Sequence, residues 1–261
     1  MQDIFQGTGA PISEGGFDTV ATDLKCGSDK ASLWAILAVE TRGFGYLPDK
    51  RPKILYERHI FHKRTGGRFS ASYPDVSNPD AGGYSGGAAE YQRLKRAMLL
   101  DRTAALESAS WGLGQVMGFN ASSIGYASVD AMVEAFKGSE DAQLEGCAKF
   151  INATPALKLA FQNHDWAKVA FFYNGKNFRK NNYDAKLRSF HSDFATNPPE
   201  VSVRAAQARL TYLGFDPHGI DGKVGRGTLN ALASFQSTRS LQKTATLDDV
   251  AQKQLLDAAG V

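Results

Sequence analysis

The sequence contains few cysteines, no long hydrophobic run and no strong excess of one charge. Its two cysteines, Cys26 and Cys147, are too few to form a disulfide framework in 261 residues. The longest uncharged apolar run near the N-terminus, residues 31–39, is far too short to cross a bilayer. Acidic and glycine-rich sequence precedes this run, so we expect neither a signal peptide nor insertion into a membrane.

Charge is nearly balanced, with 30 basic and 27 acidic side chains and a net charge of +3. Neither half of the chain carries a polybasic arm, which argues against nucleic acid as a partner. The mild positive balance suits an anionic polymer. A hydrophobic fraction of 43% and a charged fraction of 22% are typical of a globular protein, and we expect it to act as a monomer.

Recognisable metal-binding and nucleophile motifs are lacking as well. His59 and His62 are three residues apart without the His-Glu-x-x-His order of zinc proteases. His164, His191 and His218 are isolated in the sequence. No Gly-x-Ser-x-Gly elbow and no phosphate-binding glycine loop occurs. These absences predict an activity that requires no metal and no cofactor.

What the sequence does contain is helical patterning on both sides of a short connector. Residues 197–200, Asn-Pro-Pro-Glu, interrupt that patterning because two prolines stiffen the chain. We therefore predict a large helix-dominated domain over residues 1–195 and a small helical module over residues 203–261.

Individual elements follow from apolar periodicity and from turn residues. Ser28 can cap a first helix that ends at Glu40, and Thr246 with Asp249 can form a capping box for the last helix. Cys147 lies on an apolar helical stripe, which favours a buried free thiol. Other helices are predicted through residues 94–105, 144–151 and 165–175, short strands at 53–56 and 60–61, and a loop over 65–87 that we interpret as one wall of a substrate cleft.

Glu40 is the most informative residue. It continues the helical stripe of Leu33, Ile36 and Leu37, so its side chain should turn inward from the last turn of its helix. Burial and the negative end of a helix both disfavour the ionised carboxylate and raise its pKa. A carboxylic acid that stays protonated near neutral pH can donate the proton that glycosidic cleavage requires. A solvent-facing glutamate without a function is the alternative.

Four blocks in order then carry a family resemblance. They resemble phage endolysins of the N-acetylmuramidase family and, in wider terms, goose-type lysozymes and soluble lytic transglycosylases. The blocks are Ala38–Gly45 with Arg51–Phe61, Ser108–Gly118, Phe172–Gly175 and Tyr183–Leu187.

The resemblance implies a mainly α, lysozyme-like domain that cleaves the glycan of bacterial peptidoglycan. By position Glu40 would be the general acid, and Thr41 stands where the relatives usually have serine. Gln115, Tyr173 and Asn174 would line the cleft and bind sugar amides and hydroxyls, and Thr41 would also be a substrate-binding residue.

The second catalytic carboxylate is less well defined by the sequence. Glu57 either orients water or pairs with an arginine to hold the fold, and Asp49 is a weaker candidate for the water-activating role. Glu107 should be structural, and Trp111 could belong to the core or stack on a sugar ring.

The C-terminal residues resemble the common three-helix peptidoglycan-binding domain. The positions that carry this likeness are 206–215, 219–225, 228 and 233–236. Asp221 is expected to hydrogen-bond a turn rather than a ligand.

Together the two resemblances imply an endolysin that hydrolyses the bond between N-acetylmuramic acid and N-acetylglucosamine. Such a protein would be made in the host cytoplasm and would reach the periplasm and cell wall with help from another component. Two alternatives stay open: a lytic transglycosylase that forms anhydro-muramic products, and a wall-binding protein without catalysis.

Overall fold

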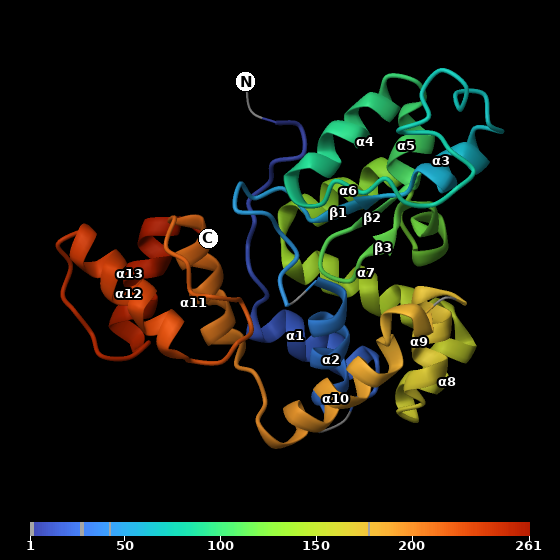
Figure 1. Ribbon diagram of the computed structural model, residues 1–261. Helices are drawn as coiled ribbons and strands as arrows, with labels where there is room; N and C mark the ends of the chain where they lie inside the picture. Colours follow the sequence, from blue (N-terminus) through green and yellow to red (C-terminus); the bar gives the residue numbers. More distant parts are fainter. Residues whose placement is uncertain (1–2, 27–28, 42, 177) are drawn as a thin grey trace.

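The computed structural model describes residues 3–26, 29–41, 43–176 and 178–261, and most of them are helical (Figure 1). None of the helices in these ranges is long and apolar enough to cross a membrane. The helices are α1 (Glu14–Asp23), α2 (Ala31–Thr41), α3 (Arg58–Arg64), α4 (Glu90–Met98), α5 (Arg102–Glu107), α6 (Val129–Gly138), α7 (Glu140–Ala153), α8 (Pro155–Gln162), α9 (Trp166–Asn174), α10 (Tyr183–Thr196), α11 (Val201–Tyr212), α12 (Arg226–Thr238) and α13 (Asp249–Ala259).

Helix α2 is the central helix of the large domain. All seven residues from Ala31 to Leu37 are buried, so α2 is surrounded by other elements on every side over its first two turns. Helices α1 and α10 lie beside it in Figure 1. The predicted cap, Ser28, lies outside the described residues. Helix α2 ends at Thr41, one residue beyond the predicted end, which places Glu40 in its last turn.

Helix α9 begins and ends where the sequence predicts. The Asp165 side chain accepts a hydrogen bond from the Lys168 backbone N–H and so caps the first turn. Gly175 ends the helix with a φ of 81°, a backbone conformation that glycine adopts without steric cost. These two signals place Tyr173 and Asn174 in the last turn of α9.

A small antiparallel sheet packs against α4, α5 and α7, with its strands in the order β1 (Ile54–Tyr56), β2 (Ala109–Trp111), β3 (Val116–Met117). Its register pairs Ile54 with Trp111 and Tyr56 with Ala109. Strand β1 confirms the prediction of a strand at this position. The hairpin of β2 and β3 contains the second family block, residues 108–118, for which the sequence analysis predicted no strand.

Two predicted elements are wrong in detail. Residues 60–61 are not a strand: they lie in α3, where the Ile60 and Phe61 backbone N–H groups both donate to the Glu57 carbonyl. The helix predicted over residues 94–105 is broken into α4 and α5, because Asp101 leaves the helical conformation and caps α5 by accepting from the Ala104 N–H. The loop over residues 65–87 is confirmed as turns and irregular backbone up to a short 3₁₀ segment.

Helices α11, α12 and α13 form a separate small core at one side of the molecule (orange to red in Figure 1). Gln207 organises the loop before α12, since its side-chain oxygen accepts from the N–H groups of Asp221 and Gly222. The Asp221 carboxylate accepts from Gln207 and from the Lys223 N–H, so its expected role in the turn is confirmed. The capping box is wrong: Asp248 caps α13 by accepting from Ala251, since a carboxylate directly before the helix reaches that N–H.

Helix α11 packs directly against the large domain. The two parts are therefore held together by this contact as well as by the connector at residues 197–200. The Arg204 guanidinium forms an ion pair with Glu140, at the start of α7, and both side chains are almost fully buried. A small apolar cluster of Phe44, Tyr46 and Ala208 lies beside this pair.

Candidate active site

Glu40 lies half-buried in the last turn of α2, as its spacing predicts. Burial raises the pKa of its carboxyl group from the ordinary value of 4.5 to about 7, because the charged form loses its hydration. A hydrogen bond from Asn174 acts in the opposite direction by stabilising the charged form. A carboxyl group with this pKa is protonated in a large share of molecules near neutral pH, which suits a proton donor.

Asn174 is the partner of Glu40 from α9. Its amide Nδ2 donates to Glu40 Oε1 over 2.8 Å. Because Oε1 accepts this bond, the proton of the neutral carboxyl group belongs on Oε2. The amide therefore selects which oxygen of Glu40 can act as a donor.

Tyr183, in the first turn of α10, lies near the same carboxyl group. Burial raises the pKa of its hydroxyl, and the Glu40 charge adds to this effect. The sequence named Tyr183 only as part of a family block, without a role. Helices α2, α9 and α10 therefore each place one of these three side chains, Glu40, Asn174 and Tyr183, in this part of the site.

Tyr173 has its hydroxyl engaged by the protein. It donates to the Gly114 carbonyl over 2.6 Å and lies 3.1 Å from the Cys147 Sγ. The Cys147 thiol is buried and unpaired, as expected, and burial raises its pKa to about 12. Tyr173 thus connects α9 to the β2–β3 hairpin beside Glu40.

Gln115 and Thr41 also use their polar groups internally. The Gln115 amide donates to Gly112, and its oxygen accepts from Ser110, within the same hairpin. The Gln115 backbone has a φ of 47°, an uncommon conformation for a residue other than glycine. The buried Thr41 hydroxyl donates back to the Leu37 carbonyl, one turn earlier in α2. Both residues hold the shape of the site in this conformation.

Glu57 lies where β1 ends and α3 begins. Its Oε2 accepts from the Tyr84 hydroxyl over 2.9 Å and lies 3.2 Å from His59 Nδ1. Arg58, the arginine next to it, donates instead to the carbonyls of Asp80 and Ala81. Glu57 therefore holds the 65–87 loop through a tyrosine rather than through an arginine.

The remaining candidates have structural partners. Asp49 forms an ion pair with Arg51 over 2.7 Å, and Glu107 pairs with Arg64. Trp111 is fully buried and donates its indole N–H to the Leu106 carbonyl, so it belongs to the core.

Comparison with known proteins identifies the family to which this site belongs. The sequence profile of the N-acetylmuramidase family matches residues 29–195. The chain belongs to the N-acetylmuramidase family. A peptidoglycan binding domain profile matches residues 200–255. The match confirms that the enzyme is a glycoside hydrolase acting on peptidoglycan, with a wall-binding domain at its C-terminal end.

A solved structure shares this fold. The crystal structure of Burkholderia AP3 phage endolysin has a TM-score of 0.65 and 38% sequence identity, over 76% of this chain and 74% of that chain. This likeness confirms the predicted endolysin-like, mainly helical fold. A search of curated proteins found no match.

Two buried carboxylates of this muramidase were missed by the sequence analysis. Glu90 is fully buried in α4, where it pairs with Arg93 and accepts from the Gly86 N–H, so it fixes the end of the 65–87 loop. Glu140 is fully buried beneath α11. Both stand at the first position of a helix. Glu90 pairs within α4 with Arg93, three residues later, whereas the partner of Glu140 is Arg204, 64 positions away, which no local sequence pattern can show.

Proposed function

We propose that this muramidase is an endolysin that hydrolyses the bond between N-acetylmuramic acid and N-acetylglucosamine, with Glu40 as the general acid. The observation that carries the proposal is the environment of Glu40: a half-buried carboxyl group at a helix end with a pKa of about 7. The protonated Oε2 donates to the leaving glycosidic oxygen while Asn174 holds Oε1. Protonation of the leaving oxygen is the step that glycosidic cleavage requires.

Hydrolysis also needs a water molecule directed at the sugar. We assign this role to Glu57, whose carboxylate lies at the end of β1 beside the 65–87 loop. Inverting hydrolysis needs a second carboxylate roughly 6.5–9.5 Å from the acid, which leaves room for the water. The loop would form the adjoining wall of the cleft, with Tyr84 and Glu57 joining it to the sheet.

Lytic transglycosylation is the second candidate, and one observation favours it. The Glu57 carboxylate is already engaged by Tyr84 and lies against His59. In transglycosylation the sugar's own hydroxyl closes an anhydro ring, so no water-orienting carboxylate is needed. Glu40 performs the same proton donation in both reactions.

The positions around Glu40 then divide into two groups. Asn174 is a positioning residue for the acid, while Tyr173, Gln115 and Thr41 maintain the walls through their internal hydrogen bonds. Substrate contacts at these three positions would come from the faces of the side chains rather than from their engaged polar groups. The proposal includes a monomeric enzyme, and release from the host cytoplasm to the wall by a separate component.

The masses of muropeptides after digestion of purified peptidoglycan test this proposal. Hydrolysis gives products with a reducing N-acetylmuramic acid end. Products lighter by one water would establish transglycosylation instead. Absence of any cleaved glycan, with the protein still bound to the wall, would leave only the binding function.

A further inference from the structure

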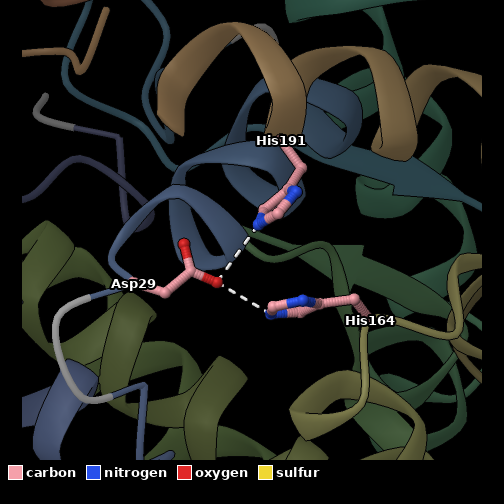
Figure 2. Close-up of side chains that lie close together, drawn as sticks. All are labelled: Asp29, His164 and His191. Atoms are coloured by element: carbon pink, nitrogen blue, oxygen red, sulfur yellow. Dashed lines mark hydrogen bonds and ion pairs between the residues drawn. The ribbon is translucent and has the colours of Figure 1, made fainter. Parts of the chain in front are cut away.

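Three residues far apart in the sequence converge at the end of α2 that is opposite to Glu40. Figure 2 shows Asp29, just before α2, facing His164 from the turn between α8 and α9 and His191 from α10. His164 Nε2 lies 2.7 Å from Asp29 Oδ2, and His191 Nε2 lies 3.1 Å from the same oxygen. All three ligand atoms lie within 4.8 Å of one another. The two histidines are isolated in the sequence, and only folding brings them together with Asp29.

The side chains of this Asp29–His164–His191 cluster are held in place by their surroundings. The buried Ser32 hydroxyl donates to Asp29 Oδ2 over 2.8 Å and orients the carboxylate. The Trp166 ring stacks on His164 at an interplanar angle of 9° and also packs on His191, with ring centroids 5.0 Å apart. A hydrogen bond such as that from Ser32 is typical of the groups that orient a ligating carboxylate, and the Trp166 ring restricts the two imidazoles.

The backbone of His164 sets the direction of its side chain. Its φ is 54°, in the left-handed region that residues other than glycine seldom occupy. His164 follows Asn163, the C-cap of α8, and its N–H donates to the Phe161 carbonyl, so this left-handed residue terminates the helix. This turn places the imidazole of His164, which remains partly exposed, beside Asp29.

We propose that Asp29, His164 and His191 form a binding site for a divalent transition metal, with Zn²⁺ as the favoured ion. Two imidazole nitrogens and one carboxylate oxygen are ligands that Zn²⁺ takes in proteins, with bonds of about 2.0–2.2 Å. Ligand atoms around a tetrahedral ion are then about 3.3 Å apart, so the distance from Asp29 Oδ2 to His191 needs to widen by about 0.2 Å and the distance to His164 by about 0.6 Å. His164 is 43% exposed in its side chain, which gives the ion a path of entry.

The site would act as a clamp on the helices that carry the catalytic residues. Asp29 and Glu40 lie at opposite ends of α2, about 16 Å apart at the helical rise per residue. His164 and Asn174 lie at opposite ends of α9 in the same order, while α10 carries Tyr183 near Glu40 and His191 near Asp29. A metal at the Asp29 end would therefore fix the three helices whose other ends form the site. At this distance it takes no part in proton transfer.

Titration of the full-length protein, prepared without a polyhistidine tag and stripped with EDTA, tests the site. We expect calorimetry with ZnCl₂ to show one binding equivalent, and thermal unfolding to show a Tm higher by several degrees with Zn²⁺ than with EDTA. Ligand that binds only the folded state stabilises it by mass action. Co²⁺ gives a second readout, because coordination by nitrogen and oxygen ligands changes its visible absorption spectrum.

Variants locate the ion. His191→Ala and Asp29→Asn, the latter nearly isosteric, should each weaken Zn²⁺ affinity at least tenfold. His218→Ala, which changes an exposed histidine of the wall-binding module, should bind as the wild type does. No stoichiometric heat and no Tm shift in the wild type would show a hydrogen-bonded cluster only. Unchanged affinity in both cluster variants, with folding verified by circular dichroism, would also overturn the proposal.

Discussion

Arg204 of α11 and Glu140 of α7 form a bidentate ion pair, with N–O distances of 2.5 and 2.6 Å, between the wall-binding module and the muramidase domain. Only 1% of Arg204 and 0% of Glu140 is exposed. Arg204 Nε also donates to the Gly43 carbonyl, and Glu140 accepts from the Gly45 N–H. The module therefore supports the loop that directly follows α2 and Glu40.

Replacing Arg204 by Ala should strongly destabilise the enzyme. Removal of one partner leaves the Glu140 charge buried without compensation, which costs roughly 3–5 kcal/mol. Urea unfolding followed by circular dichroism measures the change in the free energy of unfolding. Arg239→Ala, at an exposed position in the same module, is the control and should change stability by less than about 0.5 kcal/mol. Equal stability of the two variants would show that the pair does not hold the module in place.

Activity should fall as pH rises above about 7, because the general acid must be protonated. The pKa of Glu40 is about 7, so kcat/KM on soluble glycan fragments should decrease tenfold for each further pH unit once the carboxyl group is ionised. A pH profile of kcat/KM from 4.5 to 9 measures this decrease, which is the alkaline limb of the profile. A profile that stays flat through pH 9 would contradict the assignment.

Asn174→Ala should move that alkaline limb to higher pH. The Asn174 hydrogen bond lowers the Glu40 pKa, so its loss leaves the effect of burial unopposed. The same variant should lower kcat, because neither oxygen of the carboxyl group is then held as the acceptor. If the rate falls while the profile keeps its shape and position, Asn174 has only a structural role.

The stability of the protein should also depend on pH through the ionisation of Glu40. The folded-state pKa of about 7 exceeds the ordinary value of 4.5, so the folded protein binds more protons between these two pH values. The contribution of the neutral carboxyl group is fully present below pH 4.5 and is lost as pH rises through about 7. We therefore expect Glu40→Gln to gain Tm relative to the wild type between pH 5 and pH 8. A Tm difference independent of pH would contradict the raised pKa.

Glu57→Gln separates the two candidate reactions. If Glu57 orients the hydrolytic water, the variant should lose activity by roughly a hundredfold or more while its Tm changes little. Tyr84→Phe removes the hydrogen bond to Glu57 without removing the carboxylate, and it should keep most of the activity. Activity of Glu57→Gln close to that of the wild type, together with anhydro products, would favour transglycosylation.

The sequence predicted those features that depend on local signals. The inward direction of Glu40, the ends of α9 at Asp165 and Gly175, and the turn role of Asp221 all follow from spacing or capping within a few residues. What it could not predict depends on residues brought together by folding. The Arg204–Glu140 pair joins residues 64 positions apart, and the engaged hydroxyl of Tyr173 depends on a carbonyl 59 positions away. Reliance on local patterns also explains the error at residues 94–105. The apolar pattern there predicted one helix, although Asp101 ends the first helix and caps the next one.

The central claim, that Glu40 donates the proton for glycan cleavage, is tested most directly by Glu40→Gln. Glutamine keeps the size of the side chain and an oxygen that can accept from Asn174, but it cannot donate an acidic proton. The release of reducing ends or anhydro ends from purified peptidoglycan should fall by roughly a hundred- to ten-thousand-fold, with the Tm at or above that of the wild type. Glu145→Gln, at an exposed ion pair on α7, is the matched control and should keep full activity. Wild-type activity in Glu40→Gln would contradict the account.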